Sequence, residues 1–134
     1  MIITNRGQNG AGNTWYIVNV DNLRITAQFG AWNIVWNSDR TMEWISGAAT
    51  PMDVSDDIFE TRGEFSGGDR FGVIYTGVIE TPITTMSACN YISGGVVTLT
   101  PGSLSQRTID YGSGCDDIAV GTISGAAQDF TIPL

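Results

Sequence analysis

The sequence contains no lysine and no histidine among its 134 residues. Without imidazole, the chain lacks the side chain that most often acts as a general base or binds a transition metal near neutral pH. Without a side-chain amine, it can form neither a Schiff base nor the lysine contact of a phosphate-binding loop. What remains is carboxylate chemistry, binding of hard cations, or no chemistry at all. We therefore predict a non-enzymatic protein without a cofactor.

Positive charge is scarce, because six arginines face fourteen acidic residues and the formal net charge is −8. Proteins bind nucleic acids and anionic membrane surfaces mainly through Lys and Arg, so neither is an expected partner. No apolar run approaches the roughly 18 residues of a membrane-spanning helix, and the chain does not open with a signal peptide. Export would therefore require a targeting segment that this sequence does not contain.

Cysteine occurs only twice, as Cys89 and Cys115. Two lone thiols make a poor zinc site, because the usual additional Cys or His ligands are absent. We favour a disulfide, with buried free thiols as the alternative. The bridge would close a loop of about 26 residues and would stabilise the fold by roughly 3–4 kcal/mol. It would also imply an oxidising compartment.

Helical periodicity is nearly absent, and short alternating or β-branched runs are separated by Gly, Asn, Asp and Ser. This pattern predicts a single all-β domain over residues 1–134, an antiparallel meander of about ten strands that forms a sandwich or a strongly curved sheet. The expected strands are Trp15–Val20, Leu23–Phe29, Trp32–Asn37, Thr41–Ile45, Ile58–Phe65, Phe71–Glu80, Val96–Thr100, Arg107–Tyr111, Ile118–Ile123 and Asp129–Ile132. The expected tight turns are Asp21-Asn22, Asn37-Ser38-Asp39 and Gly67-Gly68-Asp69, and Ala48–Asp57 is an expected loop.

One internal similarity links residues 40–47, RTMEWISG, with residues 107–114, RTIDYGSG. Both segments place Arg, an aliphatic residue and an aromatic residue on one face of a strand, with Thr and an acid on the other face. A duplicated hairpin unit explains this similarity, and convergence of two strands on one in/out pattern is the alternative.

The second half of the chain carries an ordered series of motifs. Cys89-Asn90-Tyr91 precedes the strand-like run Gly94–Thr100, which leads into Arg107–Asp117 (RTIDYGSGCDD) and an apolar Phe130–Leu134. This series resembles uncharacterised surface lipoproteins of Bacteroidetes, although the lipid-anchoring Cys and N-terminal segment of that family do not occur in this sequence. The resemblance implies export, a cell-surface or periplasmic location and an antiparallel β fold. It implies no activity.

Acidic residues form two clusters. Asp53, Asp56 and Asp57, with Glu60 close behind, could supply oxygen ligands to Ca²⁺, but their spacing matches no calcium loop, and a solvated acidic loop is the interpretation we favour. Asp110, Asp116 and Asp117 are expected to form turn hydrogen bonds that fix Gly112–Gly114. The one cofactor-free enzyme class that this inventory permits is a carboxylate glycosidase. Glu43 and Asp110 occupy equivalent places in the two similar segments, and Glu64 and Glu80 are further candidates, but nothing singles out a pair.

Tryptophan is concentrated in one region, where Trp32 and Trp36 share a strand face and Trp44 follows on the next expected strand. Aromatic residues on one strand face usually form core, which is our prediction. The alternative is a flat platform that binds carbohydrate.

Both ends of the chain are apolar and strand-like, with Ile2 and Ile3 at one end and Phe130 and Ile132 at the other. An unpaired edge strand can pair with a neighbouring chain, and edges are often blunted with Lys, which this chain lacks. We therefore expect an extracellular structural or adhesive module whose partners are copies of itself or other surface proteins. Assembly would use the terminal strands, and head-to-tail addition of copies would produce filaments. Internal pairing of both ends is the alternative.

Overall fold

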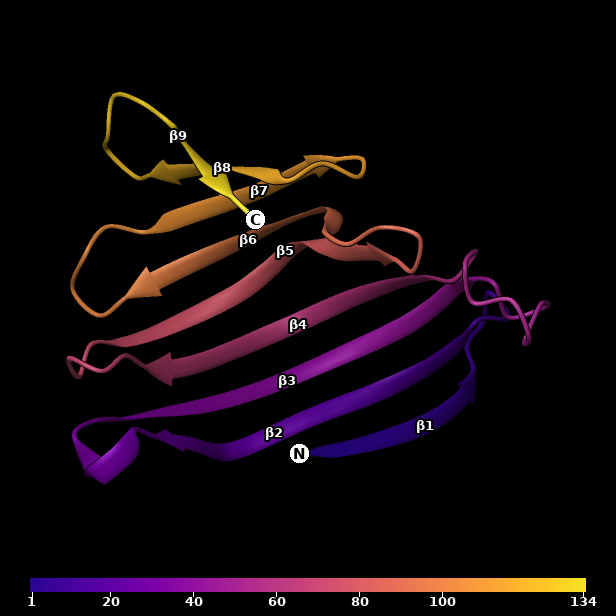
Figure 1. Ribbon diagram of the computed structural model, residues 1–134, viewed down its shortest axis with the longest axis horizontal. Helices are drawn as coiled ribbons and strands as arrows, with labels where there is room; N and C mark the ends of the chain where they lie inside the picture. Colours follow the sequence, from indigo (N-terminus) through magenta and orange to yellow (C-terminus); the bar gives the residue numbers. More distant parts are fainter.

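The computed structural model describes all residues 1–134 as one open antiparallel sheet, in which each strand pairs with the next in the chain (Figure 1). The predicted all-β antiparallel meander is confirmed, and it takes the form of a single curved sheet rather than a sandwich. The nine strands are β1 (Ile2–Gln8), β2 (Thr14–Thr26), β3 (Asn33–Ser46), β4 (Ile58–Gly68), β5 (Ile74–Met86), β6 (Ile92–Pro101), β7 (Arg107–Ser113), β8 (Ile118–Ile123) and β9 (Phe130–Pro133). A 3-10 turn, η1 (Gln28–Gly30), joins β2 to β3.

Two of the predicted turns are wrong, because β2 and β3 are each one long strand. Asp21 and Asn22 lie in a bulge of β2, where the register with β3 shifts between Val20 and Leu23 and Asn22 has a φ of 49°. Asn22 donates its backbone N–H to the side-chain oxygen of Asn37 at 2.8 Å. Asn37, which was predicted to begin a turn, therefore holds this bulge in place. Asn and Asp tolerate positive φ, which a bulge uses as readily as a hairpin turn does.

The expected loop after β3 is confirmed, whereas the expected turn at Gly67-Gly68-Asp69 begins only at Asp69, because Gly67 and Gly68 are paired in β4. The loop over residues 47–57 joins β3 to β4. The turn after β4 is built on Asp69, whose carboxylate accepts the backbone N–H of Phe71 at 2.8 Å and that of Val73 at 3.0 Å. Asp at the first position of a turn commonly stabilises it in this way.

The strand register gives the sheet two chemically different faces. Side chains alternate between the faces along each strand, and cross-strand partners share a face. The apolar face, as we name it, carries Tyr16, Trp36, Met42, Trp44, Phe59, Phe65, Tyr75, Ile79, Leu99 and Ile109. The polar face carries Asp39, Thr41, Glu43, Glu60, Arg62, Glu64, Thr76, Thr98, Thr108 and Asp110.

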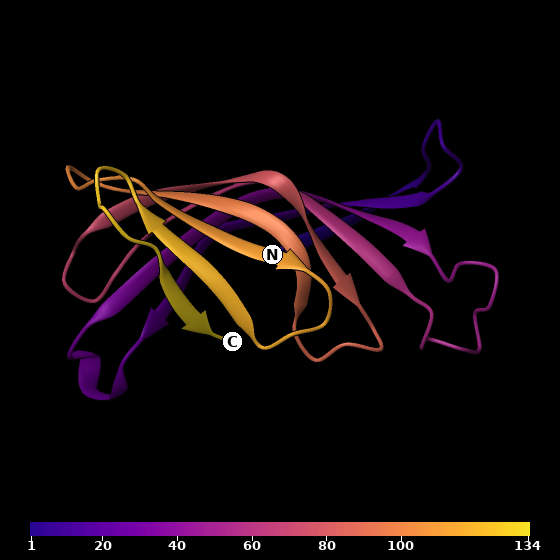
Figure 2. The same cartoon turned by 90° about the horizontal axis from the view of Figure 1, so that it is seen from above.

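The sheet is arched and twisted rather than flat (Figure 2). Irregularities in register occur in three neighbouring strand pairs, between Thr61 and Gly63, between Ile79 and Thr81, and between Gly94 and Val96. Bulges of this kind bend a strand and increase its twist. Gly63 sits at this bend with a φ of +126°, and a Cβ there would lie 2.2 Å from the carbonyl oxygen of Asp39. Glycine is therefore required at this position, because any side chain would overlap the backbone of β3.

Nothing in the chain covers the apolar face. Only 12 of 134 residues are buried, and the apolar ones among them are Val20, Val97 and Ala119. The accessible surface of 8497 Å² exceeds by about 1,700 Å² the roughly 6,800 Å² expected for a folded monomer of 14.3 kDa. The domain thus exposes more surface than a compact folded protein of this size does. No helix in the structure has the length and apolar character needed to cross a bilayer.

Candidate functional site

The apolar face contains a hollow of about 550 Å³, formed where strands β3 to β7 curve around it. Its volume lies within the range of roughly 300–1,000 Å³ that is typical of small-molecule sites. Ten of its thirteen lining residues are hydrophobic. The lining consists of Trp36, Arg40, Thr61, Phe65, Tyr75, Ile79, Ile83, Thr85, Ile92, Val97, Leu99, Ile109 and Tyr111.

Aromatic side chains form one side of the hollow. The rings of Trp36 and Phe65 stack with centroids 4.8 Å apart, and Tyr75 is tilted against Trp36 at 6.4 Å. Phe65 lies over Gly77, where a Cβ would come within 2.2 Å of its ring, so the glycine on the neighbouring strand makes room for the aromatic ring. Across the hollow, burial raises the pKa of the Tyr111 phenol. The wall is therefore preformed by cross-strand packing rather than by a loop.

Arg40 is the one charged residue in the lining. Its Nε is buried without a hydrogen-bond partner, and so is the Oγ of Ser38, two residues earlier on the same face of β3. The guanidinium forms no ion pair, since the single salt bridge in the structure joins Arg62 to Glu60. Buried polar groups without partners are costly and uncommon, so each one calls for an explanation.

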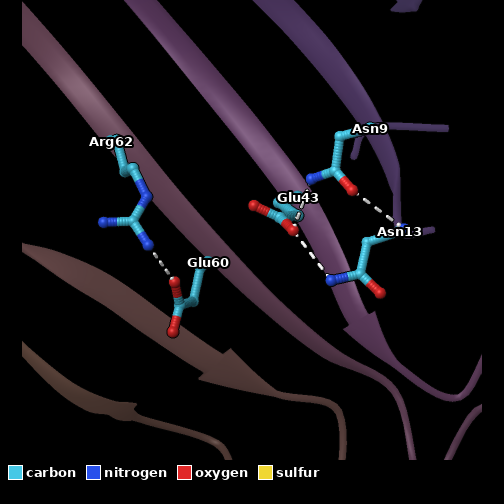
Figure 3. Close-up of polar contacts among 5 residues, drawn as sticks. All are labelled: Asn9, Asn13, Glu43, Glu60 and Arg62. Carbon is cyan, nitrogen blue, oxygen red and sulfur yellow. Dashed lines mark hydrogen bonds and ion pairs between the residues drawn. The ribbon is translucent and has the colours of Figure 1, made fainter. Parts of the chain in front are cut away.

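The polar face carries a second cluster, in which Glu43 of β3 anchors the β1–β2 turn (Figure 3). One carboxylate oxygen of Glu43 accepts the side-chain N–H groups of Asn9 at 2.7 Å and Asn13 at 2.8 Å. Those two bonds, that from Asn13 first, hold the pKa of Glu43 below its usual range. On the neighbouring strand, Arg62 pairs with Glu60 at 2.6 Å. Each charged group of the cluster thus has a partner within the chain.

The structure does not bring together Glu43 and Asp110, the two carboxylates that occupy equivalent places in the similar segments. Glu43 and Asp110 lie on β3 and β7, four strand spacings or about 19 Å apart, well beyond the roughly 5–10 Å of a catalytic pair. Glu60 is the cross-strand partner of Glu43, but a general acid requires a raised pKa and that of Glu43 is lowered. Glu80 accepts a hydrogen bond from Thr98, and Glu64 lines a separate hollow on the polar side.

The acidic loop does not bring its carboxylates together, and no group of three acidic residues converges on a point that would hold a metal. Asp53 accepts from Ser55, whose bonds lower the pKa of that carboxyl, while Asp56 accepts from the Thr50 hydroxyl at 2.7 Å. Asp57 is buried and accepts the indole N–H of Trp44 at 3.0 Å. Each carboxylate therefore has a separate structural contact.

Of the second acidic cluster, only Asp110 forms the predicted bond to Gly112–Gly114, whereas Asp116 bonds outside that turn and the Asp117 carboxylate forms no hydrogen bond within the chain. Asp110 accepts the backbone N–H of Gly112 at 2.8 Å, and Asp116 accepts that of Ile118 at 3.2 Å. The pattern shared by residues 40–47 and 107–114 is also confirmed, because Arg40 and Arg107 both lie on the apolar face and both acids on the polar face.

The three tryptophans do not form the single flat platform that was the alternative to a core. Trp36 and Trp44 share the apolar face, but eight residues of strand, about 27 Å, separate them. Trp44 stacks on Phe59 at 5.7 Å, and Trp32 lies outside the strands with 38 % of its surface exposed. Neither is the group a closed core, because the face on which Trp36 and Trp44 pack is uncovered. Sequence analysis missed Arg40 as a site residue, although its place between apolar residues of alternating β3 was a usable signal.

Cys89 and Cys115 form the predicted disulfide, with their Cα atoms 5.7 Å apart. The bond joins the β5–β6 loop to the β7–β8 loop. It therefore ties the start of β6 to the end of β7. Ile2 and Ile3 lie in β1, and Phe130 and Ile132 lie in β9, at opposite edges of the sheet. Each terminal strand is paired within the chain on one side and unpaired on the other.

No protein-family model, no curated protein and no solved structure matches this chain.

Proposed function

We propose that this chain is a non-enzymatic structural module of an exported bacterial surface protein, which joins to another copy of itself through edge strand β1. The observation that carries the proposal is the open sheet, in which β1 has one neighbour and all seven of its residues are exposed. An exposed edge offers unpaired N–H and C=O groups that another strand can satisfy. The disulfide supports a location in an oxidising compartment.

The two edges are not equivalent as connectors. The backbone N–H of Leu134 donates to the carbonyl oxygen of Asp117 at 2.8 Å and therefore points toward the rest of the sheet. Backbone N–H groups alternate in direction along a strand, so those of Phe130 and Ile132 also point toward the sheet. The backbone nitrogens of Thr131 and Pro133 face the open side of β9. Proline has no N–H, which leaves the outer side of β9 with the single donor of Thr131. The outer side of β1 contains no proline. We therefore assign the connecting role to β1 rather than to both ends.

Strand direction fixes the geometry of the contact. In a meander of nine antiparallel strands, β1 and β9 run in the same direction, so head-to-tail joining of two copies would make a parallel pair. Two β1 strands related by a two-fold axis make an antiparallel pair, which is slightly more stable per residue. Such an isologous contact closes as a dimer, whereas head-to-tail addition would give a filament.

The test compares two exposed edge threonines on the polar face, Thr4 of β1 and Thr131 of β9. We expect the unaltered protein to dimerise with rising concentration in analytical ultracentrifugation. Thr4→Lys should abolish the dimer, because lysine blunts a sheet edge, and Thr131→Lys should leave it unchanged. A protein that stays monomeric at millimolar concentration would contradict the proposal. Filaments in electron micrographs that Thr131→Lys removes would instead favour head-to-tail assembly.

A further inference from the structure

We propose that the hollow on the apolar face binds an apolar molecule that ends in a carboxylate, such as a long-chain fatty acid, and that Arg40 holds the carboxylate. This site is independent of the edge contact, because the hollow lies between β3 and β7 and includes no residue of β1. The proposal concerns binding only and involves no chemical change in the ligand.

The first argument is the unsatisfied charge. Arg40 stands alone among apolar and uncharged lining residues, its Nε is buried without a partner, and no carboxylate of the chain pairs with it. The guanidinium presents N–H donors in a planar fork that matches a carboxylate bidentately. Ser38 adds a second unpartnered buried oxygen on the same face of the same strand. A carboxylate would accept the Nε–H of Arg40, which no acceptor in the chain does.

The second argument excludes a second copy of the chain as the occupant. The carboxylates on the central strands, among them Asp39, Glu43 and Asp110, project from the polar face. Two apolar faces packed together would therefore bury Arg40 without an acid to pair with it. Burying an unpaired charge is strongly unfavourable, whereas a ligand that brings its own anionic group avoids that cost.

The third argument is the apolar character of the remaining lining. The stacked rings of Trp36 and Phe65 and the aliphatic side chains of β5 and β6 offer contact to a hydrocarbon chain. No second cation lines the hollow, because Arg107, which shares the apolar face, lies outside its lining. One positive charge beside a long apolar surface matches one negative charge on an apolar tail. Trp36, Phe65 and Tyr75 stay partly exposed in the isolated chain, so this face has apolar surface that a ligand could cover.

The experiment compares dodecanoate with dodecanol, which has the same tail and no charge, by calorimetric titration below the concentration at which either self-associates. We expect dodecanoate to bind the unaltered protein saturably, about 10- to 100-fold more tightly than dodecanol, the ratio expected for a charge-assisted hydrogen bond. Arg40→Met should reduce dodecanoate affinity to the level of dodecanol. Arg24→Met is the matched control, because Arg24 is an exposed arginine on the polar face, and it should change neither affinity.

Equal affinity of the unaltered protein for dodecanoate and dodecanol would overturn the proposal, and that comparison needs no substitution. Binding that begins only when dodecanoate forms micelles would also overturn it, as would equal losses in Arg40→Met and Arg24→Met. Arg40→Met should fold, since it removes a guanidinium without protein partners, and its melting temperature without ligand should be unchanged or higher. Arg40→Lys should retain part of the preference for dodecanoate, because it keeps the charge and loses the fork.

Discussion

On the polar face of the sheet, Glu43 and Arg62 each have partners within the chain, whereas Arg40 on the apolar face has none. The same strands supply both faces, so the difference does not arise from their secondary structure. It arises from what each face packs against: the polar face meets solvent and its own turns, and the apolar face meets nothing. The Glu43 and Arg62 groups of the polar face are therefore satisfied within the isolated chain, whereas the Nε of Arg40 on the apolar face is not.

The largest effect is expected where the bend of the sheet shapes the hollow. Gly63→Ala would place a methyl group against the backbone of Asp39 and hold alanine at a φ of +126°. We expect it to lower the free energy of unfolding by about 4 kcal/mol, from backbone strain and steric overlap together. Gly12→Ala is the control, because Gly12 has a φ of +84° and no neighbour within 4 Å, so it should cost only about 1 kcal/mol. Equal losses in urea unfolding would show that the close approach of β3 and β4 is unimportant.

A smaller effect should separate the two faces directly. Phe65→Ala removes the ring that stacks on Trp36 and covers Gly77, and we expect a loss of about 2–3 kcal/mol. The loss is smaller than for a fully buried phenylalanine because Phe65 is half-buried. Thr76→Ala, an exposed position on the polar face, should change the unfolding free energy by less than about 0.5 kcal/mol. If the two substitutions cost the same, the apolar face does not stabilise the isolated chain.

The smallest effect is the loss of stability that the Glu43 cluster on the polar face should show at low pH. Because its hydrogen bonds lower the pKa of Glu43 in the folded state, the stability that they contribute is complete above the ordinary value of 4.5 and is lost as pH falls through the lowered value. The stability difference between the unaltered protein and Glu43→Gln should therefore shrink on acidification. Asn13→Ala removes the largest cause of the shift and should weaken this dependence. A difference that stays constant between about pH 6 and pH 3 would contradict the assignment.

Several features followed from the sequence because they depend on local or pairwise physics. Alternation along a strand fixes which side chains share a face, so the common placement of Arg40 and Arg107 was predictable. Two cysteines in a chain without other thiols or imidazoles predicted the bond between Cys89 and Cys115. Asp, Asn and Gly marked where the backbone departs from a regular strand. They did not say whether the departure is a turn or a bulge, since both use the same conformations.

The arch of the sheet and the exposure of its apolar face could not be predicted from the sequence. Periodicity shows that Trp36 and Arg40 lie on one face, but the same pattern fits a covered sandwich and an open sheet equally well. What packs against a face depends on long-range contacts, which alternation along one strand does not encode. Here no layer of the chain returns over β3 to β7, so Arg40 keeps an unpaired charge in apolar surroundings. Alternation and the two cysteines were enough to predict an all-β meander with one disulfide, whereas the open apolar face follows from the path of the chain in space.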